Sequence, residues 1–137
     1  MKQILMFGCL VILGVKVVSA QTTACALGQG EIVKGVNTVT YCKSRIGMNW
    51  WSAHAWCDSI GKNLVNPSED CDCQGYENCD MSLSCPNFKN MSSGSVWTSA
   101  VAHGKTRATT IDLYNGVTNL TGSAAHNKTQ EYRALCK

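Results

Sequence analysis

Charged residues are scarce in this sequence. Asp, Glu, Lys and Arg make up 15% of its 137 residues, against about 25% in an average soluble protein. This scarcity excludes an acidic disordered tail and a charge-rich helical array. Proline occurs only twice, and the chain has no repeat of fixed period, no low-complexity tract and no long polar linker. The length leaves room for one packed, loop-rich domain.

The N-terminal apolar run is too short to be a membrane span. It covers residues 4–15, whereas a spanning helix needs roughly 20 apolar residues. Lys2 precedes the run, and Val18-Ser19-Ala20 supplies small residues at the positions that a signal peptidase reads. We therefore expect residues 1–20 to be a signal peptide and the protein to have no permanent membrane span. Residues 21–137 are expected to form a domain that is secreted or held at the cell surface, or that is periplasmic in a Gram-negative bacterium.

Clustered basic residues and catalytic motifs are also missing. Without the signal peptide, ten Lys and Arg residues oppose nine Asp and Glu residues, and they are scattered along the chain. Nucleic-acid binding needs a clustered basic surface. No Gly-x-Ser-x-Gly, His-Glu-x-x-His or phosphate-binding glycine loop occurs, and His54, His103 and His126 are expected at the surface. We expect no nucleic-acid partner, no cofactor and no enzymatic activity.

Cysteine, in contrast, is abundant. Eight of the nine cysteines lie after the predicted signal peptide. An even number of cysteines in an exported chain indicates a framework of four disulfide bonds. The spacing lacks paired Cys-x-x-Cys sequences, so we expect no structural zinc. The eight residues are Cys25, Cys42, Cys57, Cys71, Cys73, Cys79, Cys85 and Cys136.

The clearest helix signal covers residues 49–61. Asn49 is a suitable N-cap, Gly61 suits the left-handed position after the last turn, and apolar residues between them recur at helical spacing. A second, brief helix is predicted to begin at Asn66, with Pro67 in its first position and Glu69 reaching back to the cap.

The remainder of the chain predicts strands and one long loop. Residues 71–90 hold four cysteines without a helical or alternating pattern, and we expect a disulfide-tied loop. The five carboxylates from Glu69 to Asp80 are expected to be solvated rather than to bind calcium. Asn115-Gly116 is a typical hairpin turn. The predicted strand regions are residues 31–42, 96–100, 109–114, 117–120 and 132–136. This order predicts an α+β domain with two short helices and antiparallel strands.

The four tryptophans are expected to divide between core and surface. Trp56 lies on the apolar helix face and Trp97 in a predicted strand, so both are expected in the core. Trp50 and Trp51 are adjacent, so one of them must point away from the other. We take Trp51 as the candidate for ligand contact.

The segment from Met48 to Cys57, followed by Gly61 and Leu64, resembles the first helix of the C-type lectin-like domain. The last strand, Tyr132–Cys136, is similar to the aromatic-x-x-x-Cys end of that fold. The resemblance implies a C-type-lectin-like fold with disulfide bonds Cys57–Cys136 and Cys25–Cys42.

The four other cysteines would then pair among themselves. A Cys71–Cys73 bond would close a strained, tiny ring. Two arrangements remain open: Cys71–Cys79 with Cys73–Cys85, or Cys71–Cys85 with Cys73–Cys79.

The calcium motifs of the family's sugar-binding members are absent. Cys85-Pro86-Asn87 has a cysteine in place of the carboxylate, and Trp97 is followed by Thr98-Ser99 rather than Asn-Asp. A hard cation needs several oxygen ligands, so we expect no metal site. The resemblance implies recognition of an extracellular protein or glycan without calcium. The alternative is a surface or appendage subunit that self-associates. The candidate contact residues are Trp51, Tyr76, Asn87, His103, Lys105 and Asn119.

Overall fold

The computed structural model describes residue 25 and residues 30–71, 82–102, 105–119 and 125–137. The predicted signal peptide lies outside these residues, as do Cys73, Tyr76, Cys79 and His103. Side chains of residues 82–84 and 119 are also outside the description.

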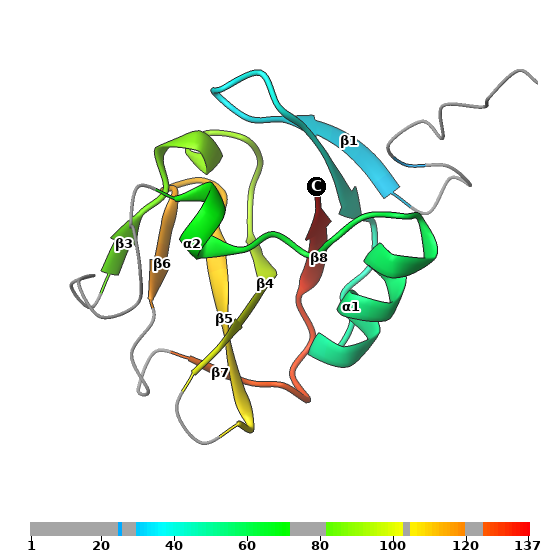
Figure 1. Ribbon diagram of the computed structural model, residues 1–137. Coiled ribbons are helices and arrows are strands. Elements are labelled where there is room, and N and C mark those ends of the chain that lie inside the picture. Colours follow the sequence, from blue (N-terminus) through cyan, green and yellow to red (C-terminus); the bar gives the residue numbers. More distant parts are fainter. Residues whose placement is uncertain (1–24, 26–29, 72–81, 103–104, 120–124) are drawn as a thin grey trace, which may run out of the picture.

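The described chain forms an α+β domain with a mixed sheet (Figure 1). Within it, no helix is both long and apolar enough to cross a membrane. The elements are β1 (Gly30–Lys34), β2 (Thr40–Ser44), α1 (Trp50–Ser59), α2 (Pro67–Asp70), β3 (Ser82–Ser84), the 3₁₀ turn η2 (Pro86–Phe88), β4 (Ser95–Val101), β5 (Arg107–Asp112), β6 (Val117–Asn119), β7 (His126–Asn127) and β8 (Arg133–Cys136).

The strand order is β1-β2-β8-β4-β5-β6-β3, with β7 paired to β5. Its neighbours are antiparallel except for β4 and β8, which are parallel. Antiparallel strands were predicted, but the parallel β4–β8 pair was not. A parallel pair needs a long crossover connection, and β5, β6 and β7 lie within the one between β4 and β8. Such long-range pairing leaves no local pattern in the sequence.

Helix α1 matches the predicted helix. The Asn49 side chain accepts a hydrogen bond from the Ser52 amide at 2.9 Å, and Gly61 has a φ of +69° after the last turn. Ala53 and Cys57 are buried, and α1 packs beside β8 (Figure 1). Trp50, two turns before Cys57, lies on the same side of the helix and packs against the same core cluster.

Helix α2 begins as predicted, with Asn66 as its N-cap, although Asp70 rather than Glu69 accepts from the backbone amide of the cap residue. The Asn66 side chain accepts from the Ser68 amide at 3.1 Å, while the Asn66 amide donates to Asp70 Oδ2 at 3.1 Å. Glu69 instead accepts from the Asn66 side-chain amide at 3.3 Å. Asp70 is buried and also accepts from Lys137 Nζ, so the expectation that it is solvated was wrong.

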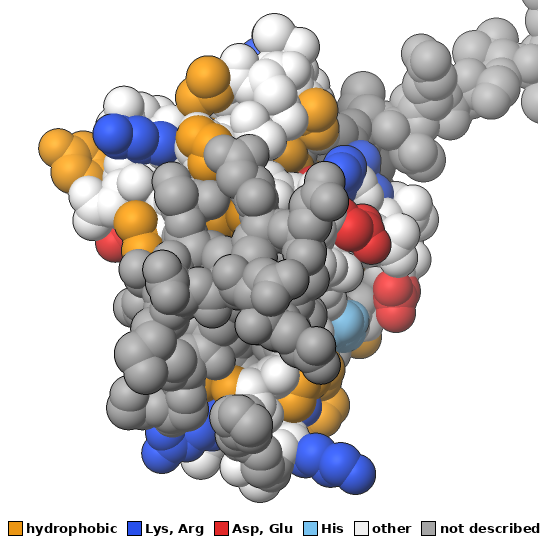
Figure 2. All heavy atoms as spheres, turned by 60° about the vertical axis from the view of Figure 1, so that its left-hand side comes forward, with side chains coloured by type: hydrophobic (Ala, Val, Ile, Leu, Met, Phe, Trp, Pro, Cys, Tyr) orange, Lys and Arg blue, Asp and Glu red, His pale blue; other side chains and the backbone are white. Residues whose placement is uncertain are grey.

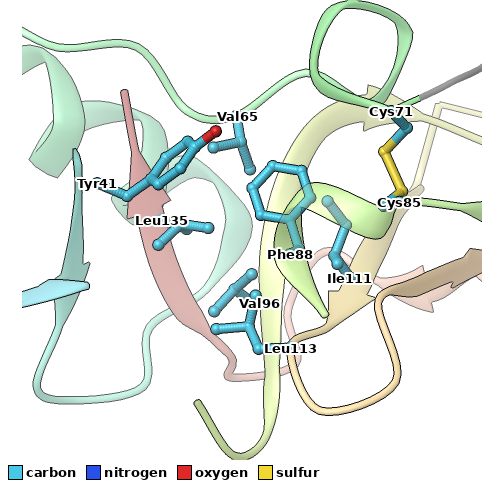
Figure 3. Packing of buried hydrophobic residues seen from close by; sticks show 9 residues of the cluster. All are labelled: Tyr41, Val65, Cys71, Cys85, Phe88, Val96, Ile111, Leu113 and Leu135. Carbon is cyan, nitrogen blue, oxygen red and sulfur yellow. A yellow bond between two sulfur atoms is a disulfide. The ribbon is translucent and has the colours of Figure 1, made fainter. Parts of the chain in front are cut away.

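The core includes a cluster of apolar side chains from several elements (Figure 3). Tyr41 of β2 and Phe88 of η2 meet there with ring centroids 5.3 Å apart. Because η2 and β3 are regular elements, the predicted loop over residues 71–90 is structured in part. Trp97 is fully buried as predicted, but Trp56 is only partly buried because it lies at the margin of the second core cluster.

Three disulfide bonds join the described cysteines: Cys25–Cys42, Cys57–Cys136 and Cys71–Cys85. The first two are the pairings that the family resemblance implied. The third belongs to the arrangement in which Cys73 bonds Cys79, a pair that lies outside the described residues. The second bond joins α1 to the central strand β8, and it therefore fixes the helix to the sheet.

Candidate binding surface

The first turn of α1 carries one exposed and one anchored tryptophan. The Trp50 indole donates to the Thr98 carbonyl at 2.8 Å, whereas Trp51 is 53% exposed. Their ring centroids lie 6.2 Å apart with planes nearly perpendicular. An edge-to-face pair of this kind is a favoured aromatic geometry. Trp51 is thus the outward-facing member of the pair, on a helix that is covalently attached to the sheet.

Lys128 is buried against both tryptophans. Only 6% of it is exposed, and its Nζ lies 3.9 Å from the centroid of Trp50 and 5.9 Å from that of Trp51. These distances are those of cation–π contacts. The Lys128 carbonyl accepts from the Trp50 amide at 3.0 Å, and its amide donates to the Thr106 carbonyl at 3.0 Å. Desolvation lowers the pKa of Lys128.

A second aromatic group lies behind this surface. Tyr132 Oη and His126 Nδ1 are hydrogen bonded at 2.8 Å, and the Tyr132 ring packs on Trp97 at 4.9 Å between centroids. The Trp97 indole donates to the Met48 carbonyl at 2.8 Å. Burial raises the pKa of Tyr132. His126 is therefore held in an aromatic network rather than free at the surface, because the chain before β8 folds against β5.

His54 also departs from the expected surface position. Its ring lies 4.2 Å from that of Trp50, four residues earlier in the helix, and its Nε2 is buried without a hydrogen-bond partner among the described residues. Desolvation lowers the pKa of His54; Asp58 acts against this shift and Lys128 adds to it. The imidazole is therefore biased toward its neutral form.

The predicted contact residues whose side chains the structure describes, Trp51, Asn87 and Lys105, do not form one cluster. Lys105 is exposed in the β4–β5 connection, next to the Thr106 carbonyl that holds Lys128. Asn87 has a structural role, because its side chain donates to the Asp70 carbonyl at 3.3 Å and its carbonyl accepts from the Val36 amide at 3.1 Å. Figure 1 shows α1 and η2 on different sides of β8.

Asn119 ends β6, opposite Ser82 of β3, and its side chain lies outside the description. Tyr76 and His103 lie outside the described residues. Among the predicted contact residues, the structure thus provides an exposed aromatic surface at Trp51 and an exposed cation at Lys105.

Sequence reasoning missed the roles of Lys128 and His54. The spacing of His54 four residues after Trp50 places both on one side of a helix, and this signal was available. Lys128 lies in a polar segment whose neighbours give no indication of burial. Its position depends on the long-range contact between residues 126–128 and β5.

Charge on the visible surface is dispersed. On the face shown in Figure 2, the Lys and Arg side chains lie at separate places along the margin rather than in one patch. No group of three or more His, Cys, Asp or Glu side chains within the described ranges is placed to hold a metal ion. Comparison of the chain with protein-family models, curated proteins and solved structures finds no match.

Proposed function

We propose that the protein is an exported, non-enzymatic recognition module of C-type-lectin-like architecture. It binds an extracellular protein or glycan without calcium, and the first turn of α1 is the centre of its contact surface. The observation that carries the proposal is Trp51, a large aromatic side chain that is 53% exposed on a helix bonded to the sheet through Cys57–Cys136. Aromatic side chains of this kind are enriched among residues that dominate binding energy.

Preorganisation supports this assignment. Trp51 packs edge-on against Trp50, which is itself fixed by a hydrogen bond to Thr98 and by Lys128 over its ring. A side chain held in its binding position loses less entropy when a ligand arrives, which strengthens the affinity. The surface combines an aromatic face with the exposed cation of Lys105, whose neighbour Thr106 accepts a hydrogen bond from the Lys128 amide. These features suit the binding of a ligand better than catalysis.

The proposal is tested by probing arrays of glycans and of cell-surface proteins with the wild-type protein and with Trp51→Ala. Loss of an interface aromatic anchor costs about 2 kcal/mol or more, so a selected ligand should bind about thirtyfold more weakly to Trp51→Ala. Tyr114→Ala is the matched control, because Tyr114 is 66% exposed in the β5–β6 turn. Binding should be equal with calcium and with a chelator. Unchanged affinity of Trp51→Ala would contradict the proposal.

One observation favours self-association as a second candidate. Strand β1 is an edge of the sheet, and its central Ile32 is 56% exposed. An exposed edge strand can pair with the edge of another copy. Sedimentation velocity of wild type and of Ile32→Lys over a wide concentration range distinguishes the candidates. Concentration-dependent association that Ile32→Lys abolishes would favour the self-associating subunit.

A further inference from the structure

Two groups that carry a positive charge at different pH values contact the same indole of the proposed contact surface. Lys128 Nζ lies 3.9 Å from the centroid of the Trp50 ring, and the centroid of the His54 ring lies 4.2 Å from it. Lysine is charged at neutral pH, whereas histidine becomes charged only in mild acid. At neutral pH Trp50 therefore has one cation beside it, and in acid it would have two.

The surroundings of His54 suit a neutral ring. Its Nε2 atom is buried and has no hydrogen-bond partner within the described part of the chain. A protonated imidazole donates from both nitrogens, so protonation would leave a charged, buried donor without an acceptor. Desolvation lowers the pKa of His54, Asp58 opposes this shift, and Lys128 adds to it. Both the burial of Nε2 and the charge of Lys128 thus disfavour a cationic ring in this position.

Of these two groups, His54 is the one with space to move. It lines a cavity of about 260 Å³ between α1 and α2. Glu69, exposed on α2, is the charged member of the lining apart from His54 itself. The other lining residues, from β4 and from the segment between the helices, are neutral: Asn63, Leu64, Asn66 and Ser99.

Lys128, in contrast, has little freedom. Only 6% of it is exposed, and hydrogen bonds of its backbone to Trp50 and Thr106 hold the residue in place. A protonated His54 that turned into the cavity would move away from the charge of Lys128 and toward water and the Glu69 carboxylate. Protonation therefore favours movement of the imidazole rather than of the ammonium group.

We propose that the contact surface at Trp51 is acid-sensitive: protonation of His54 turns its ring from Trp50 into the cavity between α1 and α2. This inference rests on the proposed recognition function and names the regulation of that site. Trp50 keeps its hydrogen bond to Thr98 and its contact with Lys128 but loses the imidazole that packs against it. Because Trp51 packs edge-on against Trp50, the exposed indole becomes less preorganised, and the surface binds its partner less tightly in acid.

The test is a pH titration of the isotope-labelled protein by nuclear magnetic resonance, from about pH 8 to about pH 4, without added ligand. The His54 ring should titrate with a midpoint below its ordinary value of 6.5, and the indole N–H signals of Trp50 and Trp51 should shift with the same midpoint. Nuclear Overhauser contacts between the His54 and Trp50 rings should be present at the neutral end and lost at the acid end.

A pair of lysine variants tests the competition between the two cations. Lys128→Met removes the charge but keeps an unbranched side chain against Trp50, and it should raise the midpoint of His54. Lys89→Met is the matched control, because Lys89 is exposed beside the β5–β6 turn, and it should leave that midpoint unchanged. Equal midpoints in the two variants would show that Lys128 does not oppose protonation.

A pair of histidine variants assigns the titration. His54→Gln should abolish the pH-dependent shifts of Trp50 and Trp51, whereas His126→Gln should leave them in place, since His126 lies beside Trp97 at 6.4 Å between ring centroids. The wild-type titration needs no variant and decides by itself. Absence of His54 titration across the range, or contacts between the His54 and Trp50 rings that persist at the acid end, would overturn the inference. Either result would leave the recognition function standing, because that function is tested at neutral pH by Trp51→Ala.

Discussion

Each of three buried charged residues in this domain, Asp70, Lys43 and Lys128, has its own polar or aromatic partner. Asp70 is paired with Lys137 and with the Asn66 amide, while Lys43 donates to Ser92 Oγ at 2.6 Å. Lys128 instead lies over an indole ring. Buried charges are costly unless they are paired, so each of these contacts has a consequence that a substitution can measure. None of the three burials could be predicted from local sequence, because each partner lies far along the chain or in the backbone.

The role of Asp70 is tested by Asp70→Ala. The substitution leaves Lys137 and the Asn66 amide without their acceptor, and we expect the free energy of unfolding to fall by about 2 kcal/mol. Asp58→Ala is the control, because Asp58 is exposed on the last turn of α1, and it should change stability by less than about 0.5 kcal/mol. Urea denaturation measures both. Equal losses in the two variants would show that Asp70 is not a structural acceptor.

The lowered pKa of His54 predicts a pH dependence of stability. Burial favours the neutral ring in the folded protein, whereas the unfolded chain takes up a proton near the ordinary value of 6.5. The stability associated with neutral His54 is therefore complete above pH 6.5 and is lost as the pH falls toward the folded pKa. His54→Gln removes this loss. Between pH 7 and pH 5 the melting temperature of wild type should fall more than that of the variant. An identical pH dependence of the two melting temperatures would show that folding does not favour the neutral form of His54.

Regular elements were predictable where the signal is local. The caps at Asn49 and Asn66 and the turn at Asn115-Gly116 depend on neighbouring residues, and the structure contains α1, α2 and the β5–β6 turn there. Strand β3 and η2 were missed, because their backbones are held by distant partners in β6 and the β5–β6 turn. The Cys85 amide, for example, donates to the Gly116 carbonyl at 2.7 Å.

Two glycines in this part of the fold provide a matched test of that packing. Gly94 and Gly116 both have positive φ, at +86° and +66°. A Cβ on Gly116 would lie 2.8 Å from the Cys85 carbonyl oxygen, whereas a Cβ on Gly94 would meet nothing within 4 Å. Both alanine variants lose stability from backbone strain, by about 1 kcal/mol. Gly116→Ala should lose at least about 1 kcal/mol more, measured by urea denaturation; an equal loss would contradict the close approach.

At the scale of the whole molecule, the disulfide bonds hold distant parts of the chain together. Cys57–Cys136 spans 79 residues and Cys71–Cys85 spans 14. The cysteine count predicted an oxidised framework, and the family resemblance implied the first of these pairs. The choice for Cys71 stayed open, because spacing alone does not distinguish between Cys79 and Cys85. Only Trp51 of the candidate surface could be predicted from the sequence. Thr98 and Lys128, which hold the neighbouring Trp50, come from segments far from α1 in the sequence.

The two bonds should differ in their contribution to stability. In the chain-entropy account, a longer closed loop restricts the unfolded chain more. Replacing Cys57 and Cys136 together by Ala should therefore lower the free energy of unfolding by about 4.5 kcal/mol, and replacing Cys71 and Cys85 by about 3 kcal/mol. Denaturant unfolding under non-reducing conditions measures both double variants. A larger loss of stability from removing the Cys71–Cys85 bond would contradict the expectation that the longer loop contributes more.

The central claim, that Trp51 is the contact point for an extracellular ligand, is tested most directly by the indole N–H signals of the four tryptophans in one nuclear magnetic resonance experiment. The Trp97 indole is buried and hydrogen bonded to Met48, so it serves as an internal reference. Addition of a ligand selected from the arrays should shift the Trp51 signal, assigned by its loss in Trp51→Phe, and leave the Trp97 signal in place. A saturating ligand that leaves the Trp51 signal unmoved would contradict the account.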